Sequence, residues 1–213
     1  MVLISIEGTI GSGKTTIINK LSQYFKHNPN VFCLCENIHL WDIISEEDNF
    51  IEKFYSNKKK YAFLFQTTVL KAMKTQIAEI YDKNEHAIII MERSILSSSK
   101  VFCKMMYDDK YITDDEKDEY LELLNDLNDF KPDYMIYLNV SCETALKNIK
   151  NRARKGEENI TIEYLNKIEL YHLKMFDKIQ HNKIIITENK NSKNDMFNKC
   201  KKEIKNILPT LYF

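Results

Sequence analysis

The sequence predicts an α/β fold of the doubly wound type, in which five parallel strands form a sheet with helices on both faces. Short apolar runs alternate with longer stretches of helical period along the 213 residues. These runs are continuous rather than alternating, which is typical of strands buried on both faces of a parallel sheet. Helices between the runs favour right-handed crossovers. No linker or repeat interrupts the pattern, so residues 1–213 are expected to form a single domain.

The strands are expected at the short apolar runs, each bounded by a turn signal or by the start of a helical pattern. The second run is entered from the turn around Pro29, and the fourth is introduced by Pro132. In chain order the expected strands are Val2–Ile6, Val31–Cys35, Ala87–Met91, Tyr134–Leu138 and Lys183–Thr187.

The helices are expected where apolar residues recur every three or four positions. Thr113 and Glu116 form a capping-box pattern at the start of one helix, and Ser141 precedes another. The expected helices are Thr15–Phe25, Ile43–Tyr55, Tyr61–Tyr81, Ile95–Tyr107, Asp114–Asn128, a segment from Ser141 to a basic stretch, Ile160–Ile179 and Asn194–Leu208.

Composition and charge exclude several classes of protein. Hydrophobic residues make up 44% and charged residues 29% of the chain, which excludes a disordered or collagen-like protein and a membrane span. The 31 basic and 31 acidic side chains balance, so no broad basic field for nucleic acid is expected and any anion site is local. Five cysteines without a CxxC pair favour buried thiols over zinc. No targeting segment is recognised before the first strand, which predicts a cytoplasmic protein without a membrane partner.

Three of the four glycines lie within six residues and form a phosphate-binding pattern. The segment Gly8-Thr9-Ile10-Gly11-Ser12-Gly13-Lys14-Thr15 fits the P-loop motif and lies between a predicted strand and a predicted helix. Its backbone N–H groups would surround phosphates at a helix N-terminus, with Lys14 at the β- and γ-phosphates and the Thr15 hydroxyl on Mg²⁺. Residues 8–16, including Thr16, are therefore the expected ATP site. The alternative is a chance match in a turn.

The sequence disfavours a guanine-nucleotide switch. None of the four glycines has an aspartate three residues before it, and no Asn-Lys-x-Asp pattern occurs.

Acidic residues follow two predicted strands, at the edge where an α/β sheet binds ligands. Glu36 follows the second strand, and Glu92 with Arg93 follows the third. A carboxylate facing a nucleoside 5′-hydroxyl can take its proton during phosphoryl transfer, and a second one near Thr15 can hold Mg²⁺. Arg93 could orient the acceptor and offset developing charge. The alternative is that these residues are solvated strand ends.

Together these segments resemble the deoxyribonucleoside kinase family over nearly the whole chain. The matching residues are Ile4 to Gly8 leading into the P-loop, Glu36 with Trp41, Phe65-Gln66-Thr67, Glu92-Arg93-Ser94, and Arg152-Ala153-Arg154 with Tyr164. The resemblance implies a P-loop kinase that uses ATP and Mg²⁺ to phosphorylate the 5′-hydroxyl of a deoxynucleoside, with an arginine-rich lid near residues 150–160. It also implies a homodimer, for which the helix at Ile95–Tyr107, with Val101, Phe102, Met105 and Met106, and the helix at Asp114–Asn128 are the candidate contacts.

The resemblance also implies roles for individual residues. Glu36 is the general base, Gln66 contacts the pyrimidine, and Trp41 and Phe102 enclose it. Tyr55 and Glu157 hold the sugar 3′-hydroxyl, and Arg152 and Arg154 close over the phosphates. The remaining acceptor contacts are Ile51, Phe65, Val69, Met73, Arg93 and Ser98. Without the family resemblance, the sequence allows other interpretations. Trp41, Tyr55 and Phe102 could be core residues. Gln66 could be an exposed helix residue, and Arg152–Lys155 could be a solvated charge run at a helix end.

Three positions resemble the thymidine-accepting members, such as mitochondrial thymidine kinase and a broad insect kinase. Met73 and Ser98 stand where members preferring deoxycytidine or deoxyguanosine carry an Arg–Asp pair, and Val69 also matches the thymidine-accepting kind. An Arg–Asp pair would crowd the 5-methyl group of thymine, whereas methionine adapts its shape. Thymidine is therefore the expected acceptor, with deoxycytidine as a second substrate.

The chain departs from the family pattern at three places. Asn148 replaces an arginine that stacks on adenine in some relatives, and Gly156 replaces a carboxylate, which is expected to loosen the lid. The loop for the donor base, around Glu188–Lys193, has no clear match. The rival functions are a nucleoside monophosphate kinase such as thymidylate kinase, which typically has Asp-Arg in place of Glu92-Arg93, and a catalytically silent P-loop protein.

Overall fold

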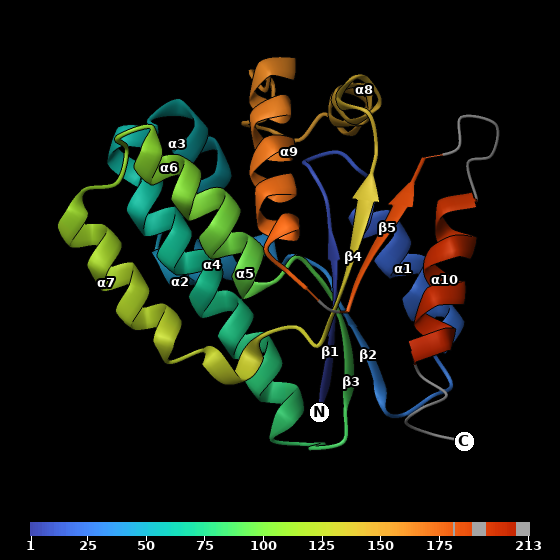
Figure 1. The fold of residues 1–213 in the computed structure, drawn as a ribbon. Helices are drawn as coiled ribbons and strands as arrows, with labels where there is room; N and C mark the ends of the chain where they lie inside the picture. Colours follow the sequence, from blue (N-terminus) through green and yellow to red (C-terminus); the bar gives the residue numbers. More distant parts are fainter. Residues whose placement is uncertain (181, 189–194, 208–213) are drawn as a thin grey trace.

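The computed structural model describes residues 1–180, 182–188 and 195–207. Within them, five parallel strands form one sheet in the order β2-β3-β1-β4-β5 (Figure 1). The strands are β1 (Val2–Glu7), β2 (Val31–Leu34), β3 (Ile88–Glu92), β4 (Tyr134–Asn139) and β5 (Lys183–Thr187). The strand order reverses at β1, which pairs with β3 on one side and β4 on the other. The expected α/β fold with a five-stranded parallel sheet is confirmed.

Helices connect the strands as the sequence pattern predicts, with some boundaries shifted. They are α1 (Lys14–Phe25), α2 (Ile38–Ser45), α3 (Phe50–Ser56), α4 (Lys58–Tyr81), α5 (Ile95–Ser97), the π-helix η1 (Ser98–Cys103), α6 (Lys104–Asp108), α7 (Asp114–Asn125), the 3₁₀-helix η2 (Asn128–Phe130), α8 (Cys142–Arg152), α9 (Ile162–Asp177) and α10 (Asp195–Ile207). The capping box of Thr113 and Glu116 is present at α7, and Ser141 caps α8. In the described part of the chain, no helix has the length and apolarity needed to cross a bilayer.

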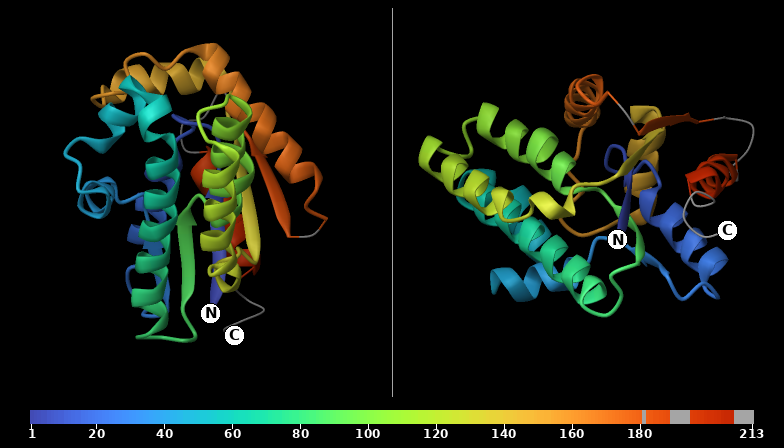
Figure 2. Two further views of the ribbon diagram at one scale, coloured as in Figure 1. Left: turned by 90° about the vertical axis from the view of Figure 1, so that its left-hand side faces the viewer. Right: turned by 60° about the horizontal axis from the view of Figure 1, so that its bottom comes forward.

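The helices form two layers on opposite faces of the sheet (Figures 1 and 2). On one face α1 and α10 pack through fully buried Ile18, Leu21 and Ile204. The other face is covered by α4, α7 and α9, which enclose the larger core around Leu70 and Ile168. The carboxyl ends of the strands meet at the edge of the sheet next to α8, where the glycine-rich segment also lies.

The outer strands differ from the expectation of burial on both faces. β2 is only partly buried, and Ile185 in β5 is 54% exposed, because each of these strands has a neighbour on one side only. The continuous apolar pattern predicts full burial correctly for the central strands β1 and β3.

Two predicted helices are interrupted. The single helix expected at Ile43–Tyr55 is wrong, because Glu46 and Asn49 adopt left-handed backbone conformations, with φ of 57° and 52°. The Asp42 carboxylate then accepts a hydrogen bond of 2.9 Å from the Phe50 amide and fixes the bend. The helix expected at Ile95–Tyr107 contains the π-helix η1, a distortion that often occurs at functional sites.

The residues first proposed for a dimer contact do not form an outer surface. Val101, Met105 and Met106 are almost fully buried within the chain's own core. On the neighbouring helices α4 and α7, Leu64 and Leu121 are 37% and 38% exposed. On this side of the molecule, exposed leucines therefore lie on α4 and on α7, the second helix expected at a dimer contact, whereas Val101, Met105 and Met106 are buried.

Candidate active site

The glycine-rich segment forms a tight loop between β1 and α1. Gly11 adopts a φ of +80°, and a Cβ on it would lie 2.3 Å from the Ala145 carbonyl oxygen, so a side chain is excluded where the loop packs on α8. The Lys14 ammonium donates hydrogen bonds of 3.2 and 2.8 Å to the Gly8 and Thr9 carbonyl oxygens. Burial, reinforced by the charge of Arg93, lowers the pKa of Lys14 to about 8. Lys14 therefore still carries its charge at neutral pH.

A large cavity surrounds this loop on the side of α8 and α10. It is lined by Gly11 to Ile17, Lys20, Glu92, Val140, Thr144, Lys147, Asn148, Asn151, Arg152, Glu188, Met196 and Phe197. The Ser12 hydroxyl oxygen is buried and has no hydrogen-bond partner among the described residues. The backbone N–H groups of a tight glycine-rich loop, the Lys14 ammonium and the Ser12 hydroxyl can all bind phosphate oxygens, so this cavity suits a nucleoside triphosphate.

Asn148, which departs from the family pattern, is bound to the loop. Its side-chain amide donates a hydrogen bond of 2.8 Å to the Gly11 carbonyl oxygen, so it ties α8 to the glycine-rich segment. Most of the unmatched loop for the donor base, residues 189–193, lies outside the described residues.

Oxygen ligands for a divalent cation lie beside Lys14. The Thr15 hydroxyl donates a hydrogen bond of 2.9 Å to Glu92 Oε2, and the Lys14 ammonium lies 3.9 Å from Glu92 Oε1. A hydroxyl and a carboxylate next to a phosphate site fit Mg²⁺, which prefers few protein oxygens together with phosphate and water.

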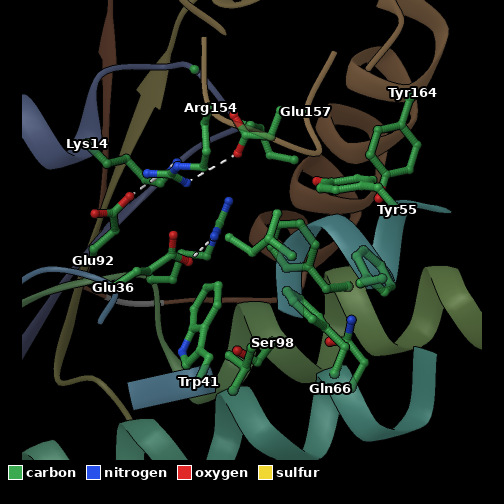
Figure 3. A pocket seen from close by; sticks show the side chains of 18 of the residues that line it. Lys14, Glu36, Trp41, Tyr55, Gln66, Glu92, Ser98, Arg154, Glu157 and Tyr164 are labelled. Carbon is green, nitrogen blue, oxygen red and sulfur yellow. Dashed lines mark hydrogen bonds and ion pairs between the residues drawn. The ribbon is translucent and has the colours of Figure 1, made fainter. Parts of the chain in front are cut away.

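A second cavity extends from Lys14 toward α3 and α4 (Figure 3). It has about 720 Å³ of space that no protein atom fills, part of it open to solvent. Its walls are Ile10, Gly11, Lys14, Glu36, Trp41, Ile51, Phe54, Tyr55, Phe65, Gln66, Val69, Glu92, Arg93, Ser98, Phe102, Met106, Arg152, Arg154, Glu157 and Tyr164.

An ion pair lines the second cavity. The Arg93 guanidinium binds the Glu36 carboxylate and sits 4.4 Å above the centre of the Phe102 ring. Burial disfavours the charged form of Arg93, but the carboxylates of Glu36 and Glu92 outweigh that effect and raise its pKa. Arg93 holds this position with a left-handed φ of 62°, a conformation that costs roughly 1–3 kcal/mol in a residue with a side chain.

One end of the cavity is lined by aromatic rings and one buried amide. Gln66 is 3% exposed and projects from α4 into the cavity (Figure 3). Trp41 packs edge-on against Phe65 with ring centroids 5.4 Å apart.

Met73 does not line this cavity itself but contacts Ser98, which does. The Ser98 hydroxyl lies 3.7 Å from the Met73 sulfur. Met73 itself lines a smaller adjoining cavity, which it shares with Glu36 and Val69.

The other end of the cavity is closed by the segment that follows α8. Glu157 is 5% exposed and pairs with Arg152 at 2.6 Å and with Arg154 at 3.2 Å. Arg152 lines both cavities, whereas Arg154 lines only the second one. Tyr55 lies next to Glu157 in this part of the cavity (Figure 3).

The expectation that Gly156 loosens the lid does not agree with the structure. Gly156 adopts a φ of +90°, and a Cβ on it would come within 2.6 Å of the Glu52 Cα atom in α3. Lys155 also pairs with Glu52 at 2.8 Å. The missing side chain therefore lets the lid pack closely on α3.

The structure thus brings together most of the residues singled out from the sequence around the two cavities, with Met73 in an adjoining position. Gly8 and Thr9 line neither cavity and contact Lys14 through their carbonyl oxygens. Sequence reasoning missed Phe54, which lines the second cavity, and Glu7, a fully buried carboxylate at the end of β1. It assigned Met106 to a dimer contact, whereas Met106 lines the second cavity. A charged residue that ends an otherwise apolar run was the available signal for Glu7.

Comparisons with known proteins agree with this geometry. The family model for deoxynucleoside kinases matches residues 4–210. A protein of Fowlpox virus named a probable deoxycytidine kinase is 33% identical over 174 residues, which cover 80% of this chain and 70% of the relative. Human deoxycytidine kinase is 26% identical over 250 residues, covering 98% of this chain and 91% of the relative. A deoxyguanosine kinase of Lactobacillus johnsonii is 29% identical over 193 residues, covering 85% and 79%.

The family match extends over both cavities and the glycine-rich loop between them. These findings confirm the resemblance at the level of the family and support an ATP-dependent kinase. The chain belongs to the deoxynucleoside kinase family.

Proposed function

We propose that this kinase transfers the γ-phosphate of ATP to the 5′-hydroxyl of thymidine, and that deoxycytidine is a second acceptor. The observation that carries the choice of thymidine is the contact between Met73 and Ser98 beside Gln66. Neither side chain is charged, and neither extends a rigid group toward the pyrimidine 5-position. A methyl contact is worth about 1 kcal/mol, so the preference over deoxycytidine is modest.

The acceptor would lie with its base toward α4 and its sugar toward the lid. Gln66 offers both a donor and an acceptor, which match the edge of a pyrimidine. Trp41 and Phe102 supply flat apolar walls, and Ile51, Phe65 and Val69 complete the enclosure. Tyr55 and Glu157 would hold the 3′-hydroxyl.

In this orientation the 5′-hydroxyl points toward Glu36, which would accept its proton as the phosphoryl group transfers. Arg93 would hold the Glu36 carboxylate in place and offset negative charge at the acceptor oxygen. Lys14 lies on the other side, next to the loop that would hold the phosphates, and Arg152 reaches both cavities. When phosphate is bound, Arg152 and Arg154 would exchange their ion pairs with Glu157 for contacts with phosphate oxygens, so that Arg154 also contacts the phosphates.

Mg²⁺, when bound, would neutralise charge on the transferring phosphates. Thr15 and Glu92 would hold it, because they are the oxygen-bearing side chains that meet at Lys14. With Glu92 placed there and Glu36 at the acceptor, the two carboxylates have separate tasks.

A nucleoside monophosphate kinase remains the closest rival, and two observations argue against it. Such enzymes typically have Asp-Arg where this chain has Glu92-Arg93. The family model that matches residues 4–210 is that of deoxynucleoside kinases. The catalytically silent alternative has no support, since the family is one of active kinases.

The test is a comparison of two acceptors with γ-labelled ATP. Thymidine is expected to yield labelled thymidine 5′-monophosphate, whereas thymidine monophosphate yields little or no diphosphate. Rapid diphosphate formation without thymidine turnover would show instead a nucleoside monophosphate kinase.

A homodimer and a cytoplasmic location also remain proposals. The support for the dimer is the family resemblance together with the exposed leucines on α4 and α7, Leu64 and Leu121.

A further inference from the structure

A buried carboxylate lies under the catalytic ion pair. Glu7 is the last residue of β1, directly before the glycine-rich loop, and its side chain is fully buried. Its Oε1 accepts a hydrogen bond of 2.6 Å from the Ser94 hydroxyl. A buried carboxylate is costly unless it forms specific interactions. Glu7 lines neither of the two main cavities, so its contacts with the protein must carry any role it has.

The Ser94 hydroxyl links Glu7 to the segment that follows β3. Its oxygen accepts a hydrogen bond of 3.2 Å from the Ser97 amide, which closes the cap of α5. A serine hydroxyl has a single proton to donate, and Glu7 receives it. These two bonds fix the position and the rotation of fully buried Ser94.

The residue held between these contacts is Arg93. Its amide donates a hydrogen bond of 3.0 Å to the Ile6 carbonyl oxygen, and the next residue is anchored on Glu7 through its hydroxyl. Two successive residues of β1 therefore hold a backbone whose left-handed φ of 62° is disfavoured for a residue with a Cβ. That backbone directs the Arg93 guanidinium to Glu36 and over the Phe102 ring.

We propose that Glu7 is a positioning residue, which keeps Arg93 aimed at Glu36 through the Ser94 hydroxyl. The inference rests on the proposed function, in which Arg93 and Glu36 act in the transfer. Without the Glu7 contact, Ser94 can rotate, the Arg93 backbone relaxes from its left-handed conformation, and the guanidinium moves away from the carboxylate. Substrate binding at Gln66 and at the phosphate loop would be little affected.

Two substitutions separate the hydrogen bond from the charge. Glu7→Leu fills the same space without an acceptor, whereas Glu7→Gln keeps an oxygen that can receive the Ser94 proton. We expect Glu7→Leu to lower kcat about tenfold or more, with KM for ATP and thymidine within about threefold of native. Glu7→Gln is expected to recover most of kcat. Ser94→Ala removes the same bond from its other side and is expected to act like Glu7→Leu, which also covers the case that Glu7→Leu fails to fold.

A double-mutant cycle then tests whether Glu7 acts through Arg93. In an Arg93→Lys background the guanidinium is absent, so adding Glu7→Leu or Ser94→Ala should lower kcat less than twofold. A merely structural role would lower kcat by the same factor in both backgrounds. Ile204→Val, which truncates the remote core beside α10, serves as the control for lost stability and should keep the native kcat.

Three outcomes would contradict the proposed role of Glu7 or of Arg93. Equal losses in the two backgrounds would overturn the positioning role, as would native kcat in a folded Glu7→Leu variant. Native turnover of Arg93→Lys on its own would instead contradict the proposed role of the Arg93 guanidinium, and so would be distinguished from a failure of Glu7 alone.

Discussion

Replacing Glu36 with glutamine tests the assignment of the general base. The substitution keeps the size of the side chain and one hydrogen-bond acceptor for Arg93, but removes the basic oxygen. A positioned general base contributes roughly 10²- to 10⁴-fold to the rate, so we expect kcat to fall by about 10²-fold or more. Glu92 contacts Thr15 and Lys14. It could act as the base in place of Glu36 only if it gave up these contacts.

The cost to the fold is smaller than the cost to the rate. Glu36 and Arg93 form a mostly buried pair, with side chains 12% and 11% exposed. A hydrogen bond to a charged group contributes about 1.5–3 kcal/mol, and the amide retains part of it. At roughly 2–4 °C per kcal/mol for a chain of this size, Tm should fall by about 10 °C at most. We therefore expect circular dichroism at the assay temperature to show a folded variant.

The assay follows binding and turnover separately. Trp41 is the single tryptophan of the chain and lines the acceptor cavity, so its fluorescence reports thymidine binding directly. We expect Glu36→Gln to bind thymidine within a few-fold of native affinity while losing turnover. Glu47→Gln, which changes a partly exposed carboxylate paired with Lys53, is the matched control and should keep the native rate. Unchanged turnover in Glu36→Gln would refute the assignment and make Glu92 the next candidate.

Other predictions concern the donor site, the base pocket, assembly and pH. Lys14→Ala should abolish transfer without loss of the fold in circular dichroism, and native kcat/KM for ATP should decline above about pH 8, where Lys14 loses its proton. Met73→Arg with Ser98→Asp should lower the ratio of thymidine to deoxycytidine kcat/KM by about tenfold; an unchanged ratio would contradict the pocket assignment. Light scattering at micromolar concentration should give twice the chain mass of 25.3 kDa, and Leu121→Glu should shift it to the monomer, whereas a monomeric native protein would exclude the dimer. Burial lowers the pKa of His172 to about 3, below its value of about 6.5 in the unfolded chain. Because the unfolded chain therefore takes up this proton at a higher pH than the folded chain, the stability of the fold decreases as the pH falls below about 6.5. Denaturant titrations should show about 2 kcal/mol of that loss at pH 5, and His172→Phe should remove this contribution.

The parts of the fold that depend on local sequence are those that the sequence predicts. The P-loop requires glycines at fixed spacing, and the capping box requires Thr113 and Glu116 three residues apart, so both can be recognised in a short window. The central strands are continuous apolar runs because both of their faces are buried.

Features that depend on contacts between distant segments could not be predicted in this way. The bend between α2 and α3 is fixed by Asp42 across a turn, and Gly156 is explained only by its close approach to Glu52 of α3. The role of Asn148 as a contact to Gly11 joins residues 137 positions apart. No periodicity or composition signals such pairings.

In the candidate site, too, the sequence predicts which residues take part but not how distant residues pair. The family resemblance gives the residues that surround the acceptor, because their order and spacing form a pattern along the chain. It does not give the pairing of Arg152 and Arg154 with Glu157. Nor does it show that Met73 stands behind the main cavity and reaches it through Ser98.

We propose above all that this kinase phosphorylates thymidine at the site between Glu36 and the P-loop. Its most direct test is a competition in one tube, with ATP and equal concentrations of thymidine, deoxycytidine, deoxyadenosine and deoxyguanosine, in which each 5′-monophosphate is quantified at early times. We expect thymidine monophosphate as the major product, with deoxycytidine monophosphate second. Formation of deoxycytidine or purine monophosphates while thymidine stays unchanged would contradict it.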